Sequence, residues 1–83
     1  MRVEPFVTSY RDEEHIRVYF FPGMDDNGHV LARMMFITPL SDYRYTRLND
    51  GSIEYILNEN PSEIKCRIQN ISTGETKDKI LKT

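Results

Sequence analysis

The sequence predicts an all-β protein of five to seven short antiparallel strands, formed as a small barrel or a two-layer sandwich. Three observations support this prediction. Short segments rich in β-branched and aromatic residues alternate between apolar and polar positions with a period of two. Turn-forming Asn, Asp and Gly residues separate these segments. A chain of 83 residues can bury one small core, so we expect a single domain over residues 1–83.

The first clear strand covers residues 15–21, HIRVYFF, where Ile16, Val18 and Phe20 share one face. The next apolar segment, HVLARMMFITP at 29–39, is apolar on both faces. Such a strand is usually covered above and below. We therefore expect 29–39 to lie centrally in its sheet.

The stretch PGMDDNGH, residues 22–29, joins these two segments. It contains Pro-Gly and Asn-Gly pairs, which are typical of tight turns and hairpins, so we expect 15–21 and 29–39 to pair antiparallel. Its two aspartates raise a calcium loop as the alternative. An EF-hand loop needs a bidentate glutamate at its twelfth position, but the twelfth residue counted from Asp25 is Phe36. The stretch is therefore predicted to turn the chain.

Two further hairpins follow. They join 42–48 to 52–57 through an Asn-Asp-Gly turn, and 63–71 to 76–82 through a turn at 72–75. Because sequential strands usually pair, we expect meander order.

Two segments leave an α+β alternative open, with one short helix near 9–16 or 61–70. Ser9 three residues before Asp12 fits a capped helix or a polar turn equally well. Pro61 suits the first position of a helix. For 61–70 we favour a strand, because Ile64, Cys66 and Ile68 alternate with polar residues.

Composition argues against several functions. The formal net charge of −2, from 11 basic and 13 acidic residues, indicates no polyanion-binding surface. Cys66 is the only cysteine, which excludes an intramolecular disulfide and suits a small core residue. The N-terminus lacks the apolar run of a signal peptide, and no segment approaches the about 18 apolar residues of a membrane span. We expect a soluble cytoplasmic protein with no membrane association.

No catalytic constellation is evident. His15 and His29 are expected at opposite ends of the predicted hairpin, where they could not share a metal ion. The acids at 12–14 are typical of a solvated turn. We expect no enzyme, no metal and no cofactor.

The segment DYRYTR at 42–47 is the most suggestive. On a strand, Tyr43, Tyr45 and Arg47 would share one face, with Arg44 on the other. Tyr and Arg are enriched at protein interfaces and also on sheets that stack single-stranded bases. Tyrosines that simply border a small core are the plain alternative. The candidate partner-binding residues are Tyr43, Arg44, Tyr45, Arg47, Tyr19 and Arg17.

These residues predict a non-catalytic protein-binding module, a small regulator or inhibitor that acts by surface complementarity. The partner would be another protein, and the small core makes a homodimer the default assembly. Small single-domain chains without catalytic residues are common among the accessory proteins of viruses and mobile elements. The size of the chain alone therefore suggests such an accessory protein. Single-stranded nucleic-acid binding is the alternative, disfavoured by the net charge of −2.

Overall fold

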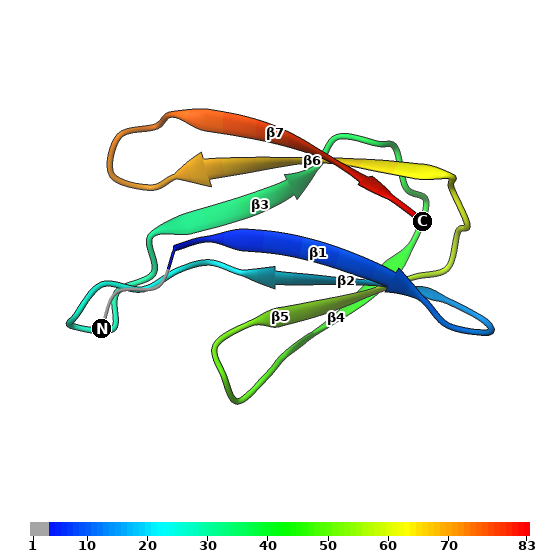
Figure 1. Ribbon diagram of the computed structural model, residues 1–83, viewed down its shortest axis with the longest axis horizontal. Helices are drawn as coiled ribbons and strands as arrows, with labels where there is room; N and C mark the ends of the chain where they lie inside the picture. Colours follow the sequence, from blue (N-terminus) through cyan, green and yellow to red (C-terminus); the bar gives the residue numbers. More distant parts are fainter. Residues whose placement is uncertain (1–3) are drawn as a thin grey trace.

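The computed structural model describes residues 4–83 and contains seven strands in two antiparallel sheets (Figure 1). The all-β class is therefore confirmed, as a two-layer arrangement and not as a closed barrel. The strands are β1 (Phe6–Arg11), β2 (Ile16–Phe21), β3 (Ala32–Phe36), β4 (Tyr43–Arg47), β5 (Ile53–Leu57), β6 (Glu63–Asn70) and β7 (Thr76–Lys82).

The larger sheet has the order β1-β2-β5-β4, and the smaller has the order β3-β6-β7. Figure 1 shows the smaller sheet above the larger one. The predicted alternation in β2 is confirmed, since Ile16, Val18 and Phe20 are all buried. From the smaller sheet, Ile64 and Cys66 of β6 are fully buried in the same core. Burial of these alternating side chains is what holds the two layers together.

The predicted hairpins β4-β5 and β6-β7 both form. In the first turn, Gly51 has φ of 90°, a left-handed conformation that glycine adopts without the steric cost of a Cβ. The alternation over residues 63–70 produces β6, so the helix alternative near 61–70 is wrong. Since Pro61 precedes the strand by two residues, it does not interrupt the ladder.

The helix alternative near 9–16 is also wrong, because β1 extends through Arg11 and a polar turn follows. The Asp12 N–H donates to the His15 carbonyl at 3.0 Å. Asp12 Oδ1 accepts from the backbone N–H groups of Glu14 and His15 at 3.0 and 2.7 Å. The aspartate side chain thus closes the β1-β2 turn.

The predicted pairing of 15–21 with 29–39 is wrong. β2 is already hydrogen-bonded on one side to β1, where the sequence alone predicted no strand, and on the other side to β5. With both of its edges filled, β2 has no free edge for β3, which pairs with β6 in the smaller sheet instead. Meander order therefore holds only within the three local hairpins.

The stretch 22–29 does turn the chain, as predicted. Gly28 N–H donates to the Asp25 carbonyl at 3.0 Å, and Met24 forms an isolated antiparallel bridge with Val30. This small loop closes on itself before the chain crosses to the other sheet. β3 then lies at the edge of its sheet, so the expected central position is wrong.

Candidate functional site

β4 is an edge strand that is exposed along its whole length. It pairs only with β5, and all five of its residues are exposed. Tyr45, at its centre, keeps 62% of its surface accessible. Proteins commonly protect such edges with charged side chains, lysine above all, with proline or with a bulge; YRYTR carries two arginines but neither proline nor lysine.

The hydrogen-bond pattern identifies the backbone groups on the free edge of β4. Leu48 N–H donates to the Ser52 carbonyl at 2.8 Å, and Asn58 N–H donates to the Asp42 carbonyl at 3.5 Å. Bonded and non-bonded pairs alternate along an antiparallel ladder, so even-numbered residues of β4 bond to β5. The N–H and C=O groups of Tyr43, Tyr45 and Arg47 consequently point away from β5.

The cross-strand register also assigns the side chains of β4 to faces. Tyr43 is opposite Leu57, and Tyr45 is opposite Tyr55. Leu57 is buried in the core, so Tyr43, Tyr45 and Arg47 lie on the face that turns toward the smaller sheet. Arg44 lies on the opposite, outer face.

A cluster of aromatic rings lies between β4-β5 and β3. Phe36 makes edge-to-face contacts with Tyr43 and Tyr55, with ring centroids 5.2 Å apart in both pairs. The rings of Tyr43 and Tyr55 also contact each other, at 5.8 Å. The cluster joins the open sides of the two sheets.

Beside this cluster the sandwich is open, and we call the opening the β3–β4 groove. It consists of two adjoining hollows of about 400 and 360 Å³, which share Met34 and Tyr55. Several apolar side chains around it remain well exposed, a feature typical of interaction sites. They are Val30 at 45%, Met35 at 42%, Leu48 at 37% and Ile71 at 55%.

The charged side chains that line the groove are all arginines. They are Arg33 and Arg47. Arg33 Nε donates to Gln69 Oε1 at 2.7 Å, a neutral acceptor. Within residues 4–83, neither Arg44 nor Arg47 forms an ion pair with a carboxylate.

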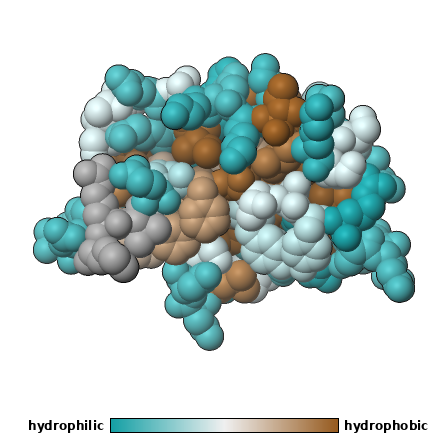
Figure 2. Space-filling view, in the orientation of Figure 1, coloured by the Kyte–Doolittle hydropathy of each residue, from teal (hydrophilic) through white to brown (hydrophobic). Residues whose placement is uncertain are grey.

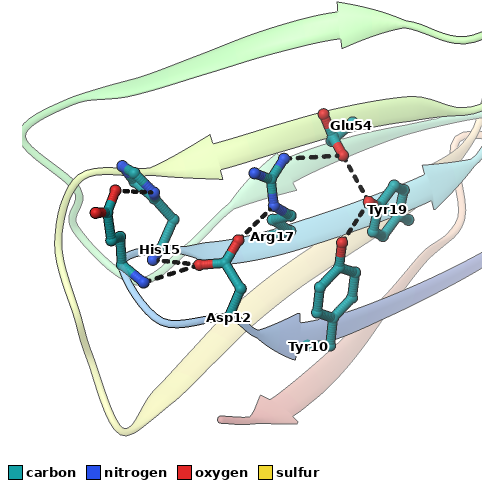
Figure 3. Close-up of polar contacts among 7 residues, drawn as sticks. Tyr10, Asp12, His15, Arg17, Tyr19 and Glu54 are labelled. Carbon is teal, nitrogen blue, oxygen red and sulfur yellow. Dashed lines mark hydrogen bonds and ion pairs between the residues drawn. The ribbon is translucent and has the colours of Figure 1, made fainter.

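Arg17 and Tyr19, also predicted as site residues, lie on the outer face in a network of their own (Figure 3). Arg17 Nε donates to Asp12 Oδ2 at 2.7 Å, and Arg17 Nη1 donates to Glu54 Oε2 at 3.3 Å. Tyr19 donates its hydroxyl proton to the same Glu54 oxygen at 2.5 Å, and its hydroxyl is also bonded to that of Tyr10 at 3.0 Å. The polar side chains of this network therefore serve as hydrogen-bond partners for one another.

The electrostatics of this network follow from its contacts. Hydrogen bonds from Arg17 and from the backbone N–H groups of His15 and Glu14 lower the pKa of Asp12 to about 2. The hydrogen bond to the Glu54 carboxylate raises the pKa of Tyr19. At neutral pH, Asp12 is therefore ionised and Tyr19 keeps its proton. We assign this network to holding the β1-β2-β5 surface in place.

The structure thus divides the six predicted residues between two surfaces. Tyr43 and Arg47 line the groove, and Tyr45 lies between them on the same face, with its ring centroid 6.2 Å from that of Tyr55. Arg44 lies on the outer face in the same row as Arg17, with Ile56 of β5 between them. The alternation within 42–47 is enough to put Arg44 on the opposite face from Tyr43, Tyr45 and Arg47. The positions of Arg17 and Tyr19 relative to these residues follow only from the strands that pair with β2.

Other functional candidates were missed at the sequence level. Met34 and Phe36 contribute to the groove only because β3 packs opposite β5, a relation that no local pattern contains. On the outer face, Phe6 stacks on Phe21 at 5.6 Å, next to the stacked rings of Tyr10 and Tyr19 at 5.5 Å. In Figure 2, a band of ring-bearing side chains crosses the middle of the molecule. The β-forming run FVTSY was the available signal for β1.

The remaining chemical candidates have structural partners. Cys66 is a buried core residue, as predicted, and burial raises the pKa of its thiol to about 11. His29 Nδ1 lies 3.1 Å from Asp25 Oδ2 in the 22–29 loop. In the part of the chain that the structure describes, no three His, Cys, Asp or Glu side chains gather as metal ligands do. No helix within residues 4–83 has the length and apolarity needed to cross a bilayer.

Comparison with family models, with curated proteins and with solved structures finds no match to this chain.

Proposed function

We propose that the protein is a non-catalytic binding module, a small regulator or inhibitor, that takes an extended segment of a partner protein as an added strand beside β4. The observation that carries the proposal is the free edge of β4, where Tyr43, Tyr45 and Arg47 offer backbone donors and acceptors next to an apolar groove. In strand addition, main-chain hydrogen bonds supply affinity, and pockets for alternate side chains supply specificity. β4 and the β3–β4 groove provide these two components side by side.

The far edge of the smaller sheet provides a contrast. β7 carries Lys77, Lys79 and Lys82 in seven residues, a pattern that discourages the pairing of another strand. The β3–β4 side instead combines a lysine-free edge with exposed apolar groups. The two edges therefore differ in the way expected if only one of them binds a partner.

A proline substitution can separate the added strand from the fold itself. In Tyr45→Pro, the lost N–H is one that points away from β5, so the β4-β5 ladder keeps its bonds. The matched control is Ile80→Pro. Asn70 N–H donates to the Glu75 carbonyl, so Asn70 and Glu75 form a hydrogen-bonded pair. Bonded and non-bonded pairs alternate along the ladder, which makes Lys65 and Ile80 a non-bonded pair and directs the Ile80 N–H away from β6. Each variant thus loses one outward N–H from an edge strand.

The experiment selects binders from a displayed library of random nine-residue peptides on the wild-type protein. The binders are then tested on both variants, after circular dichroism has shown that each variant folds. We expect binders to lose at least tenfold in affinity on Tyr45→Pro and to keep their affinity on Ile80→Pro. A library that yields no binder, or binders indifferent to Tyr45→Pro, contradicts strand addition at β4.

Single-stranded nucleic-acid binding has less support from the same residues. Arg17 is already paired with Asp12 and Glu54, so its charge is not available to phosphates. The rings of Tyr10 and Tyr19 stack on each other, which leaves fewer ring faces for bases. We propose the cytoplasm as the site of action, because the lone cysteine is a reduced thiol in the core.

A further inference from the structure

We infer that the segment bound beside β4 is acidic, runs antiparallel to β4, and carries the pattern acid, any residue, apolar, acid, apolar. This inference rests on the proposed strand addition and adds the chemistry of the partner.

The charges on β4 and around the groove favour an acidic partner. The chain carries a net charge of −2, yet the charged side chains of β4 and of the groove lining are all arginines. Elsewhere in residues 4–83, Arg17 and Arg67 contact carboxylates, at 2.7 and 2.8 Å. Arg44 and Arg47 lack such a partner in the same part of the chain. A carboxylate from a partner would fill this role.

The carboxylates next to β4 in the sequence are already engaged. Asp42 Oδ2 accepts from Asn58 Nδ2 at 2.7 Å. Asp50 Oδ1 accepts from the Ser52 backbone N–H at 2.9 Å and from the Ser52 hydroxyl. Asp50 is held in the β4-β5 turn and Asp42 is held at the open end of the same hairpin, so the arginines of β4 remain available to an added strand.

The register fixes where the acids must lie. On an antiparallel strand, the residue opposite Arg47 comes first and faces the groove side, and the residue opposite Arg44 comes fourth and faces outward. The third and fifth residues, opposite Tyr45 and Tyr43, face the groove with its exposed apolar rim. An antiparallel orientation matches every strand pair already present in the two sheets.

A second copy of the chain fits this edge less well. If two β4 strands paired about Tyr45, Arg44 would stand opposite the partner's Thr46, and the two Arg44 side chains would be diagonal neighbours on the outer face. The two Arg47 side chains would lie apart on the other face, each opposite a Tyr43, and neither β4 carries a carboxylate that could pair with Arg44 or Arg47. Two long arginine side chains are within reach of each other at diagonal positions and would repel, whereas an acidic segment would pair with both arginines of β4, so it is the better occupant.

Three peptides of equal length test the inference. The first is Thr-Glu-Thr-Val-Glu-Val-Thr, capped at both ends and labelled. The second replaces both glutamates by glutamine. The third keeps the composition but moves each glutamate by one position, opposite Thr46 and Tyr43. Fluorescence anisotropy would measure the affinity of each for the wild type, Arg44→Gln, Arg47→Gln, Tyr45→Pro and Ile80→Pro, at about 50 and about 500 mM salt.

We expect the first peptide to bind about three- to tenfold more tightly than the other two at low salt, since partly exposed ion pairs contribute modestly. Each arginine variant should lose part of this preference, and high salt should reduce it. Tyr45→Pro should abolish binding, whereas Ile80→Pro should not. This combination of results would establish both the acidic chemistry and the register.

The other outcomes are distinct. Equal affinity for the glutamate and glutamine peptides, lost on Tyr45→Pro, would overturn the acidic chemistry and leave strand addition standing. Equal affinity for the first and third peptides would overturn the register. No binding of the first peptide would overturn this inference, and the library selection would then judge strand addition separately. A dimer in light scattering that Tyr45→Pro converts to a monomer would assign the edge to a second copy.

Discussion

The contact between Phe36 and Tyr55 should couple the two sheets energetically. Phe36 belongs to β3 in the smaller sheet and Tyr55 to β5 in the larger one, and their rings meet edge to face at 5.2 Å with an interplanar angle of 83°. Replacing either residue by leucine removes the ring and keeps an apolar side chain. Comparison of the double variant with the two single variants then gives the coupling free energy between the two rings.

The magnitude follows from the contacts. An aromatic pair in this geometry contributes about 0.5 to 1.5 kcal/mol beyond the burial of its area. Phe36 contacts two rings, so Phe36→Leu should lower the free energy of unfolding by about 1 to 3 kcal/mol. The coupling between Phe36 and Tyr55 alone should be about 1 kcal/mol. A domain of this size has about 4 to 12 kcal/mol in total, so the loss is readily measured.

Urea unfolding of the wild type, the two single variants and the double variant measures this coupling. As a control, Tyr10→Leu replaces Tyr55→Leu in the cycle, since Tyr10 stacks on Tyr19 on the outer face. The control cycle should be additive within about 0.5 kcal/mol. If the Phe36–Tyr55 cycle is additive to the same degree, the aromatic cluster does not join the sheets, and our account of the groove is wrong.

Three further predictions concern single residues. Asp12→Asn should lower the urea midpoint at pH 7, because the pKa of Asp12 falls from 3.8 to about 2 on folding; the ionised form favours the folded state above about pH 4. This advantage is lost as the pH falls toward 2, so equal urea midpoints at pH 7 would contradict the Arg17 contact. Cys66→Ser should cost about 1 to 3 kcal/mol in urea unfolding, because it buries a hydroxyl among apolar groups; an unchanged midpoint would show that the site is wet. Gly74→Ala should lower the thermal midpoint through a cost of about 1 to 2 kcal/mol from the backbone alone, since φ is +78° and an added Cβ meets no atom within 4 Å. No shift in that midpoint would argue against the left-handed turn.

Much of the fold could be predicted from the sequence because its signals are local. The alternation in 63–70 and the glycine turn after it specify β6 and β7 without reference to the rest of the chain. The run 6–11 was harder to assign, because its large aromatic residues, Phe6 and Tyr10, are exposed at 48% and 49%, while the smaller Val7 is buried. Large apolar residues are usually more buried than small ones, and this segment shows the reverse. The polar residues of the turn that follows also favoured a capped helix as an alternative to a strand.

The candidate site divides in the same way. Tyrosines and arginines at alternating positions of 43–47 could be identified from composition and period alone. Which of them border a groove depends on β5 being the only neighbour of β4 and on β3 packing across from β5, both long-range relations. Arg17 and Tyr19 looked equivalent in the sequence, but Asp12 and Glu54 engage them on the outer face.

The sequence by itself determined the all-β class, the period of each predicted strand and the two hairpins that follow residue 42, because each depends on residues a few positions apart. Only the tertiary structure decided the partners of β2, the edge position of β3 and the groove beside β4. Those features depend on which strand edges remain unpaired once the local hairpins have formed and packed. The hydrophobic effect that packs the sheets is non-directional, so it favours the burial of apolar faces but does not determine which strands pair with each other. The competition among long-range strand pairings selects the partner.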